Sequence, residues 1–280
     1  MVVFFRSRQV TDSRDKIYGM LGLATGQYAG LVEPDYTRSP EEVFEAAALA
    51  SVDRTGKLEI LSHLYGQRQL ELPSFVPDWT ASISSYDRYS QYQERLSYIH
   101  RYAASGDRSA EFNLIAAGKA VTRGIIFDVI ANTGSFPSSL SYGEFLNEVR
   151  DLADVDRCPG GLVHRKPPLH DALYDDDVGT INKLFCAMAV GRRFITTEKG
   201  YIGFAPEKCE KGDLIVILPG GDVPYTLRPE PIADDLREQG HGSSSCYTIL
   251  GDSYVHGIMD GEAFDLLEET KGELQEIVLV

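Results

Sequence analysis

Apolar positions follow a helical period in the first part of the chain and a period of two in its last third. The helical pattern is clearest in residues 39–55, where Ser39, Pro40 and Glu42 have the order of a capping box with proline at the first helical position. A shorter helix is predicted in "TDSRDKIYGMLGLA", where Asp15 falls in the first turn and suits the helix dipole. The pattern therefore predicts helices in the N-terminal part.

The middle of the chain has a mixed pattern. "LPSFVPDWTAS" holds two prolines, each of which favours an extended conformation in its predecessor, so we expect a fixed loop anchored by burial of Trp79. Residues 86–102 are polar and rich in tyrosine, which indicates a surface segment that is helical in its middle. "FNLIAAGKAVTRGIIFDVI" is rich in β-branched residues and predicts two strands, or one strand bent at Gly118. Further helices are expected in "SYGEFLNEVRDLA" and "VGTINKLFCAMAVG".

Alternation begins near Arg193, in "RRFITTEKGYIGFAP", "GDLIVILPGGDVPYTLRP" and "CYTILGDSYVHGIM". About five short strands predict a small antiparallel barrel or meander, because closing a sheet hides its edges. The predicted class is α+β, with a helical N-terminal and middle part packed on a small antiparallel C-terminal β-barrel or meander. We expect one compact domain, 1–280, in which 1–190 is mainly helical with a strand pair near 112–131 and 191–280 is mainly β.

Charge and composition exclude several classes of function. The chain carries 42 acidic and 27 basic residues, a formal net charge of −15 at pH 7, so it repels a phosphate backbone and no nucleic-acid partner is expected. No run approaches the ~18 apolar residues of a membrane span, and no signal peptide is recognised, so a cytoplasmic protein without membrane attachment is expected. Neither the cysteines nor the histidines have metal-ligand spacing, and no nucleotide-binding loop occurs, so no metal or cofactor is predicted.

The stretch "YVHGIMDGEAF" concentrates polar chemistry in eleven residues. In its functional interpretation His256 forms an acid–base pair with Asp260 or Glu262, and Tyr254 is a hydrogen-bond donor. In its structural interpretation the glycines make turns, while His256 and Asp260 bond to neighbouring backbone.

A second group of candidates lies in "RRFITTEKGYIGFAP" and "VPDW". Alternation places Arg193 and Thr197 on one face of a strand, with Tyr201 just beyond it, so these side chains line a pocket or face solvent. Asp78 and Trp79 either contact a ligand or anchor their loop.

Five motifs in order resemble the downstream half of fungal heterokaryon-incompatibility (HET) proteins: "TDSRDKIYGMLGLA", "DYTRSPEEVF", "LPSFVPDW", "RRFITTEKGYIGFAP" with "GDLIVILPGGDVPYTLRP", and "YVHGIMDGEAF". The resemblance extends from about Arg6 to Glu262. In that family an N-terminal HET domain with the cell-death activity precedes this region. The sequence starts just upstream of the first motif, so that domain is expected to be absent and its death function is not carried over.

The resemblance implies two functions of different classes. The first is a cofactor-free enzyme of fungal secondary metabolism that isomerises or cyclises a small apolar, terpenoid-like molecule, as HET-like cyclases and Diels–Alder catalysts do. Such a step needs orientation and hydrogen-bond donors rather than a nucleophile. The predicted donors are Tyr254, His256, Tyr201 and Arg193. The predicted substrate-binding residues are Trp79, Asp78, Thr197 and Asp260.

The alternative is a non-catalytic HET-related recognition or regulatory module in incompatibility signalling. Its partner would be a HET-type protein or a second copy of the chain, with the tyrosine-rich residues 86–102 as a contact surface. An enclosed pocket favours the enzyme, and an exposed apolar patch favours the protein-binding module.

Overall fold

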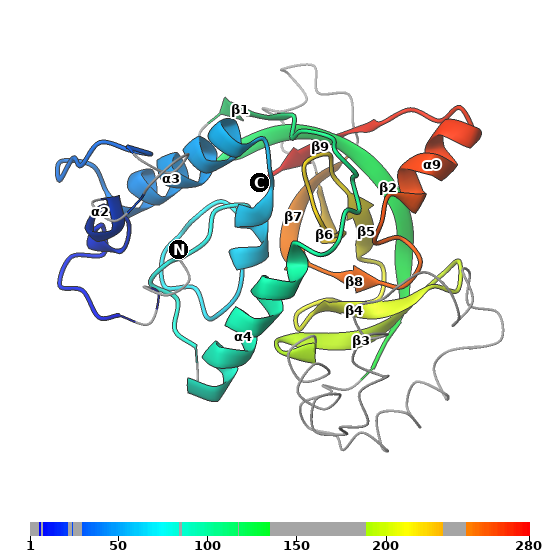
Figure 1. Ribbon diagram of the computed structural model, residues 1–280, viewed down its shortest axis with the longest axis horizontal. Helices are drawn as coiled ribbons and strands as arrows, with labels where there is room; N and C mark the ends of the chain where they lie inside the picture. The colour runs from blue at the N-terminus through cyan, green and yellow to red at the C-terminus, as the bar shows by residue number, and fades with distance from the viewer. Residues whose placement is uncertain are drawn as a thin grey trace.

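The structure is a computed structural model that describes residues 6, 8–21, 24, 30–83, 86–116, 118–134, 189–231 and 245–280. The helix predicted in "SYGEFLNEVRDLA", and nearly all of the one predicted in "VGTINKLFCAMAVG", lie outside these residues. Helices of the N-terminal part gather on one side of the molecule and most of the strands on the other (Figure 1). The predicted α+β class is confirmed.

The N-terminal helices are α2 (Asp15–Leu21), α3 (Pro40–Thr55), the 3-10 helix η2 (Glu59–His63) and α4 (Tyr86–Ile99). None of the helices in the described part of the chain has the length and hydropathy to span a bilayer.

Helix α3 begins with the predicted capping box. The Glu42 backbone N–H donates to Ser39 Oγ over 3.2 Å, and the Ser39 backbone N–H donates to a Glu42 carboxylate oxygen over 2.7 Å. Two N–H groups that the helix itself leaves unpaired are thereby satisfied.

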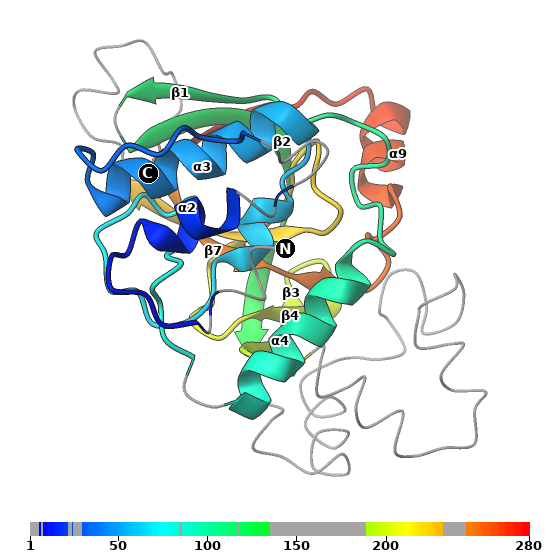
Figure 2. The ribbon, with the colours of Figure 1, turned by 60° about the vertical axis from the view of Figure 1, so that its left-hand side comes forward.

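The helix predicted within residues 86–102 is present as α4, but the segment does not lie wholly on the surface, because one side of it is buried. Tyr92, Arg95, Ile99 and Tyr102 are all buried. Their spacing of three, four and three residues places them on one face of a helix. Helix α4 lies beside β3 (Arg192–Thr197) and β4 (Ile202–Pro206), so this face is covered (Figure 1, Figure 2).

The described residues form a nine-stranded sheet. Besides β3 and β4, its strands are β1 (Phe112–Ala116), β2 (Lys119–Thr133), β5 (Leu214–Ile217), β6 (Tyr225–Pro231), β7 (Ser245–Asp252), β8 (Tyr254–Val255) and β9 (Gln275–Leu279). Of the two alternatives predicted for this stretch, two strands are present: β1 and β2 pair antiparallel on either side of Gly118.

Five of the strands are paired in a closed circuit. Strand β2 pairs with β5, β5 with β6 and β6 with β7, all antiparallel. The circuit continues from β7 to β9 through a parallel pairing and returns from β9 to β2. Strand β2 is 15 residues long, and it curves past the other strands in Figure 1. Each strand of the circuit therefore has two partners, which removes the free edges that promote aggregation.

The main core lies between the helices and this circuit. One buried cluster joins the two sides: it contains Phe44 of α3, Phe75 and Trp79 of the loop after η2, and Tyr225 of β6. A second cluster lies beneath α9 (Glu262–Glu269), which contributes Phe264. Apolar burial on both sides of the sheet thus fixes the positions of the loops and strand ends that carry polar groups.

Candidate functional site

The structure places three predicted residues around β8. Tyr254 Oη lies 3.4 Å from His256 Nδ1, and the Tyr254 ring lies 5.9 Å from the ring of Tyr102. The His256 backbone N–H donates to Ile202 O over 2.9 Å, which continues the pairing of β4 with β8. Asp260 is exposed. The structure therefore brings Tyr254 and His256 together and leaves Asp260 on the surface.

A second group lies on the hairpin of β3 and β4. Thr197 Oγ1 accepts a hydrogen bond of 2.9 Å from the Tyr201 backbone N–H, and the Tyr201 ring packs edge-on against Phe127 at 5.0 Å. Arg193 is half-buried and pairs with Ala205. Five of the six residues of β3 are buried, so alternation does not divide this strand into a pocket face and a solvent face.

Asp78 and Trp79 are both fixed inside their loop. The Trp79 ring lies edge-on to Phe44 at 5.0 Å, and its side chain is buried in the main core. The Asp78 carboxylate accepts hydrogen bonds from three backbone N–H groups and one hydroxyl, at 2.5 to 3.0 Å. Burial alone would raise the pKa of Asp78, but these hydrogen bonds outweigh it and lower the pKa below its ordinary value.

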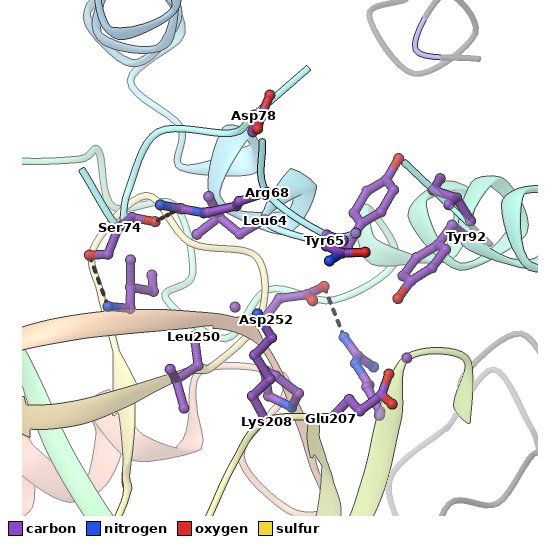
Figure 3. A pocket seen from close by; sticks show the side chains of 18 of the residues that line it. Leu64, Tyr65, Arg68, Ser74, Asp78, Tyr92, Glu207, Lys208, Leu250 and Asp252 are labelled. Atoms are coloured by element: carbon purple, nitrogen blue, oxygen red, sulfur yellow. Dashed lines mark hydrogen bonds and ion pairs between the residues drawn. The ribbon is translucent and has the colours of Figure 1, made fainter. Parts of the chain in front are cut away.

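A cavity of about 590 Å³ lies where α4, the loop of residues 64–83, the strand β7 and the ends of β3 and β4 meet. Tyr65 and Tyr92 lie on one side of it, across from Asp252, Glu207 and Lys208 (Figure 3). Of the eight predicted site residues, Asp78 is the one that lines it. The cavity is the candidate functional site because it combines volume with buried charged groups.

Two buried arginines share one buried carboxylate in the cavity. Arg192 Nη2 lies 2.8 Å from Asp252 Oδ2, and Arg95 Nη2 lies 3.5 Å from Asp252 Oδ1. Each of the three side chains is at most 4% exposed. Burial would raise the pKa of Asp252, but the charges of Arg192 and then Arg95 outweigh it and hold this pKa below its ordinary value.

A third buried arginine, Arg6, contacts residues of the cavity wall. The Arg6 guanidinium donates to the backbone carbonyls of His63, Tyr65 and Asp78, and it lies 4.2 Å from the centre of the Tyr65 ring. Tyr65 stacks on Tyr92 with ring centres 4.1 Å apart. Arg95 lies 4.7 Å from the Tyr92 ring centre. Cation–π contacts and stacking therefore fix the aromatic wall of the cavity.

The same region lowers the pKa of a histidine. Burial, and then the nearby charge of Arg6, lower the pKa of His63 from 6.5 to about 3. His63 is therefore neutral at physiological pH and adds no charge to the site. The charged residues that line the cavity are arginines, a lysine and carboxylates, which suit a charged or strongly polar ligand.

One group outside the cavity has the composition of a metal site. Glu59, His100 and Asp222 place ligand atoms within 4.8 Å of one another. Lys57 Nζ lies 3.4 Å from Asp222 Oδ1 and supplies positive charge there. An ammonium group therefore partly neutralises this cluster.

Sequence reasoning missed Arg95, Arg192 and Asp252, the charged centre of the cavity. Arg95 carried a weak signal, because it lies at helical spacing between Tyr92 and Ile99. Arg192 precedes the candidate Arg193, and Asp252 stands in "LGDS", which has the composition of an ordinary turn. These residues are far apart in the sequence, so no local pattern joins them.

Comparison with known proteins places these observations in a family context. The model of the Het-6 β-barrel domain matches residues 171–273. The chain is also 25% identical, over 357 aligned residues, to heterokaryon incompatibility protein 6 (OR allele) of Neurospora crassa. The predicted HET resemblance is confirmed. The alignment covers 92% of this chain and 50% of the relative, so the chain spans about half of that protein's length. No solved structure matches the chain.

Proposed function

We propose that this chain is a cytoplasmic, non-catalytic recognition module of the HET type, and that the cavity beside α4 is its recognition site. The observation that carries this proposal is the ion pair of Asp252 with Arg192, because a general acid or base needs a pKa near the working pH. Arginine stays protonated, and Asp252 is held ionised. The similarity to a heterokaryon incompatibility protein supports recognition as the task.

The cavity supports a polar ligand better than an apolar one. A cyclase or Diels–Alder catalyst acting on a terpenoid-like molecule needs walls that match an apolar body. Seven charged residues line this cavity: Arg68, Asp78, Arg95, Arg192, Glu207, Lys208 and Asp252. The cofactor-free cyclase is therefore not the function that we propose.

We infer further that the closed circuit of five strands is the β-barrel for which the matching family model is named. Strands β3 to β8 and helix α9 fall within the matched residues 171–273. Strands β2 and β9 lie outside them and complete the circuit. On this proposal residues 1–280 form a single domain, because β2 and the main core join the N-terminal part to the barrel.

The test is a fusion assay between Neurospora crassa strains that are otherwise compatible. One strain expresses the chain, and growth or arrest of the fused cells is scored. We expect expression to change the outcome of fusion and Gln67→Trp, at an exposed position that lines the cavity, to abolish that change. Gln69→Trp is the matched control, since Gln69 is also exposed but is not a lining residue.

Two results would overturn the proposal. The first is a fusion outcome that Gln67→Trp and Gln69→Trp affect equally. The second is conversion of a fungal metabolite to a product of unchanged mass by the purified chain, without added cofactor. That second result would restore the cyclase hypothesis.

A further inference from the structure

We propose that the cavity binds a small molecule through an anionic group, a phosphate or a carboxylate, held by the guanidinium groups of Arg95 and Arg192 with the Lys208 ammonium at the mouth. This inference deepens the proposed recognition function and rests on it, because it names the chemical class of the ligand.

The cavity concentrates positive charge in an acidic protein. The chain as a whole carries a formal net charge of −15. Four of the lining residues are cationic and three are anionic, and the buried Arg6 behind the wall adds a further cation. Buried charge without compensation is costly, so a local excess of cations favours a bound anion.

Of the three lining carboxylates, Asp78 is the one least available to compensate the arginines. Its two oxygens accept hydrogen bonds from the backbone of Gln69, Leu70 and Thr80 and from the Thr80 hydroxyl. Glu207 is exposed, whereas Asp252 is buried. Asp252 therefore serves both Arg95 and Arg192 as their buried carboxylate.

Arg95 has donor capacity to spare. Its contacts with Val190 O and Ser62 O are 3.4 Å long, and its contact with Asp252 is 3.5 Å long. Charge-assisted hydrogen bonds of this kind are typically ~2.7–2.9 Å long. Arg95 Nε has no hydrogen-bond partner among the described residues, although the side chain is only 4% exposed. A ligand oxygen can therefore satisfy donors that the protein leaves poorly bonded.

The volume admits more than a bare ion. A cavity of about 590 Å³ is in the range of small-molecule sites. Lys208 is an exposed lining residue, whereas Arg95 and Arg192 are buried, so a ligand that enters from solvent meets Lys208 before the guanidinium groups. This arrangement suits an organic ligand whose anionic end enters first.

The first experiment measures binding of four probes to the purified chain by calorimetry, at constant ionic strength set with sodium chloride. The probes are inorganic phosphate, phenyl phosphate, benzoate and the neutral benzamide. We expect phenyl phosphate or benzoate to bind with one site per chain and benzamide not to bind. The stronger of the two anions identifies the phosphate or the carboxylate as the natural group. Equal binding of benzamide, or no binding of any anion, would overturn the inference.

The second experiment removes the negative charge of Asp252, which competes with the ligand for the two arginines. Asp252→Asn should tighten binding of the preferred probe by roughly tenfold, since a charge-assisted bond to arginine is then available to it. Asp213→Asn is the matched control, because Asp213 is also buried and paired with an arginine, Arg228, outside the cavity. Equal affinities of the two variants would count against the site.

Variants of two exposed lysines test the same inference if Asp252→Asn does not fold. Lys208→Gln should weaken probe binding about threefold, whereas Lys211→Gln, also exposed but not a lining residue, should leave it unchanged. Failure of the two proposals can be told apart. Anion binding without an effect on cell fusion refutes recognition alone, and a fusion effect lost in Gln67→Trp without anion binding refutes the ligand class alone.

Discussion

Asp252 Oδ2 and Arg192 Nη2 lie 2.8 Å apart, with side-chain exposures of 4% and 2%. Arg95 approaches the other carboxylate oxygen from α4. The Asp252 carboxylate, at the end of β7, thus connects the start of β3 to α4. One wall of the cavity is therefore held together by charge as well as by apolar packing.

The first prediction concerns this ion pair. Among the described residues, Arg192→Met leaves Asp252 with the longer contact to Arg95 as its ion pair, so we expect it to lower the free energy of unfolding by about 3–5 kcal/mol. Asp252→Leu should have a similar cost. The double variant should cost clearly less than the two single variants together, because it also removes the carboxylate that Arg192→Met leaves poorly compensated, although Arg95 then loses its contact with Asp252.

Urea denaturation at pH 7 measures all three variants. Arg228→Met is the control, since Arg228 forms its ion pair with Asp213 at a more exposed position. Its cost should be about 1 kcal/mol. Additive costs of Arg192→Met and Asp252→Leu would contradict the coupling.

The second prediction concerns pH and His63. The folded pKa of about 3 lies below the ordinary value of 6.5, so the unfolded chain takes up a proton that the folded chain rejects as the pH falls. The contribution of His63 to the free energy of unfolding should therefore be fully present above pH 6.5 and be lost as the pH falls toward 3. The slope from this group is at most about 1.4 kcal/mol per pH unit. His63→Gln should flatten the slope between pH 6.5 and pH 4.5.

The measurement is the free energy of unfolding in urea at several pH values in that window. His100→Gln is the control, because the His100 side chain is 58% exposed. If both variants keep the full slope, the proton uptake belongs to another group.

Local features of the fold were predictable from the sequence. The capping box of α3 depends on Ser39 and Glu42 alone, and it is present as predicted. The helix α9 was missed, because its N-cap is Gly261 and no side chain caps it. The sequence therefore lacked the polar start signal by which α3 was recognised.

The candidate site depended on contacts that a single sequence does not show. Arg192 and Arg193 are adjacent, and choosing between them requires knowing which face of β3 meets α4. Asp252 is separated from Arg95 by more than half of the chain. Burial and pairing of such residues follow from the packed fold and have no local period.

The third prediction compares two copies of one short pattern. Asp78 and Asp35 each accept hydrogen bonds from the backbone N–H and the hydroxyl of a threonine two residues later. Asp78 is buried and also accepts from Gln69 and Leu70, whereas Asp35 is more exposed. Asp78→Asn should lower the free energy of unfolding by about 2–3 kcal/mol, because it replaces an acceptor with a donor near buried N–H groups. Asp35→Asn should have a small effect.

Thermal unfolding of the two variants at neutral pH tests this prediction. Equal and small shifts would mean that the loop does not depend on the Asp78 carboxylate. A selective loss at Asp78 would establish a structural role for a residue that also lines the cavity.

The last prediction concerns the contact between Gly191 and α4. Gly191 has a φ of 62°, and a Cβ there would overlap the Tyr92 hydroxyl. Gly191→Ala should therefore push Tyr92 and α4 away from β3, at a cost of about 2–4 kcal/mol in the free energy of unfolding. Gly212→Ala is the matched control, since Gly212 has a φ of 96° but open space at its Cβ position.

The control should show only the backbone cost of a positive φ, about 1 kcal/mol. Both variants are measured by urea denaturation, and the anion probes are titrated into each. Because Arg95 lies on the same helix as Tyr92, Gly191→Ala should also weaken anion binding, and Gly212→Ala should not. Equal stability losses would show that α4 yields to the extra methyl group, and unchanged binding would show that the Arg95 position does not depend on this contact.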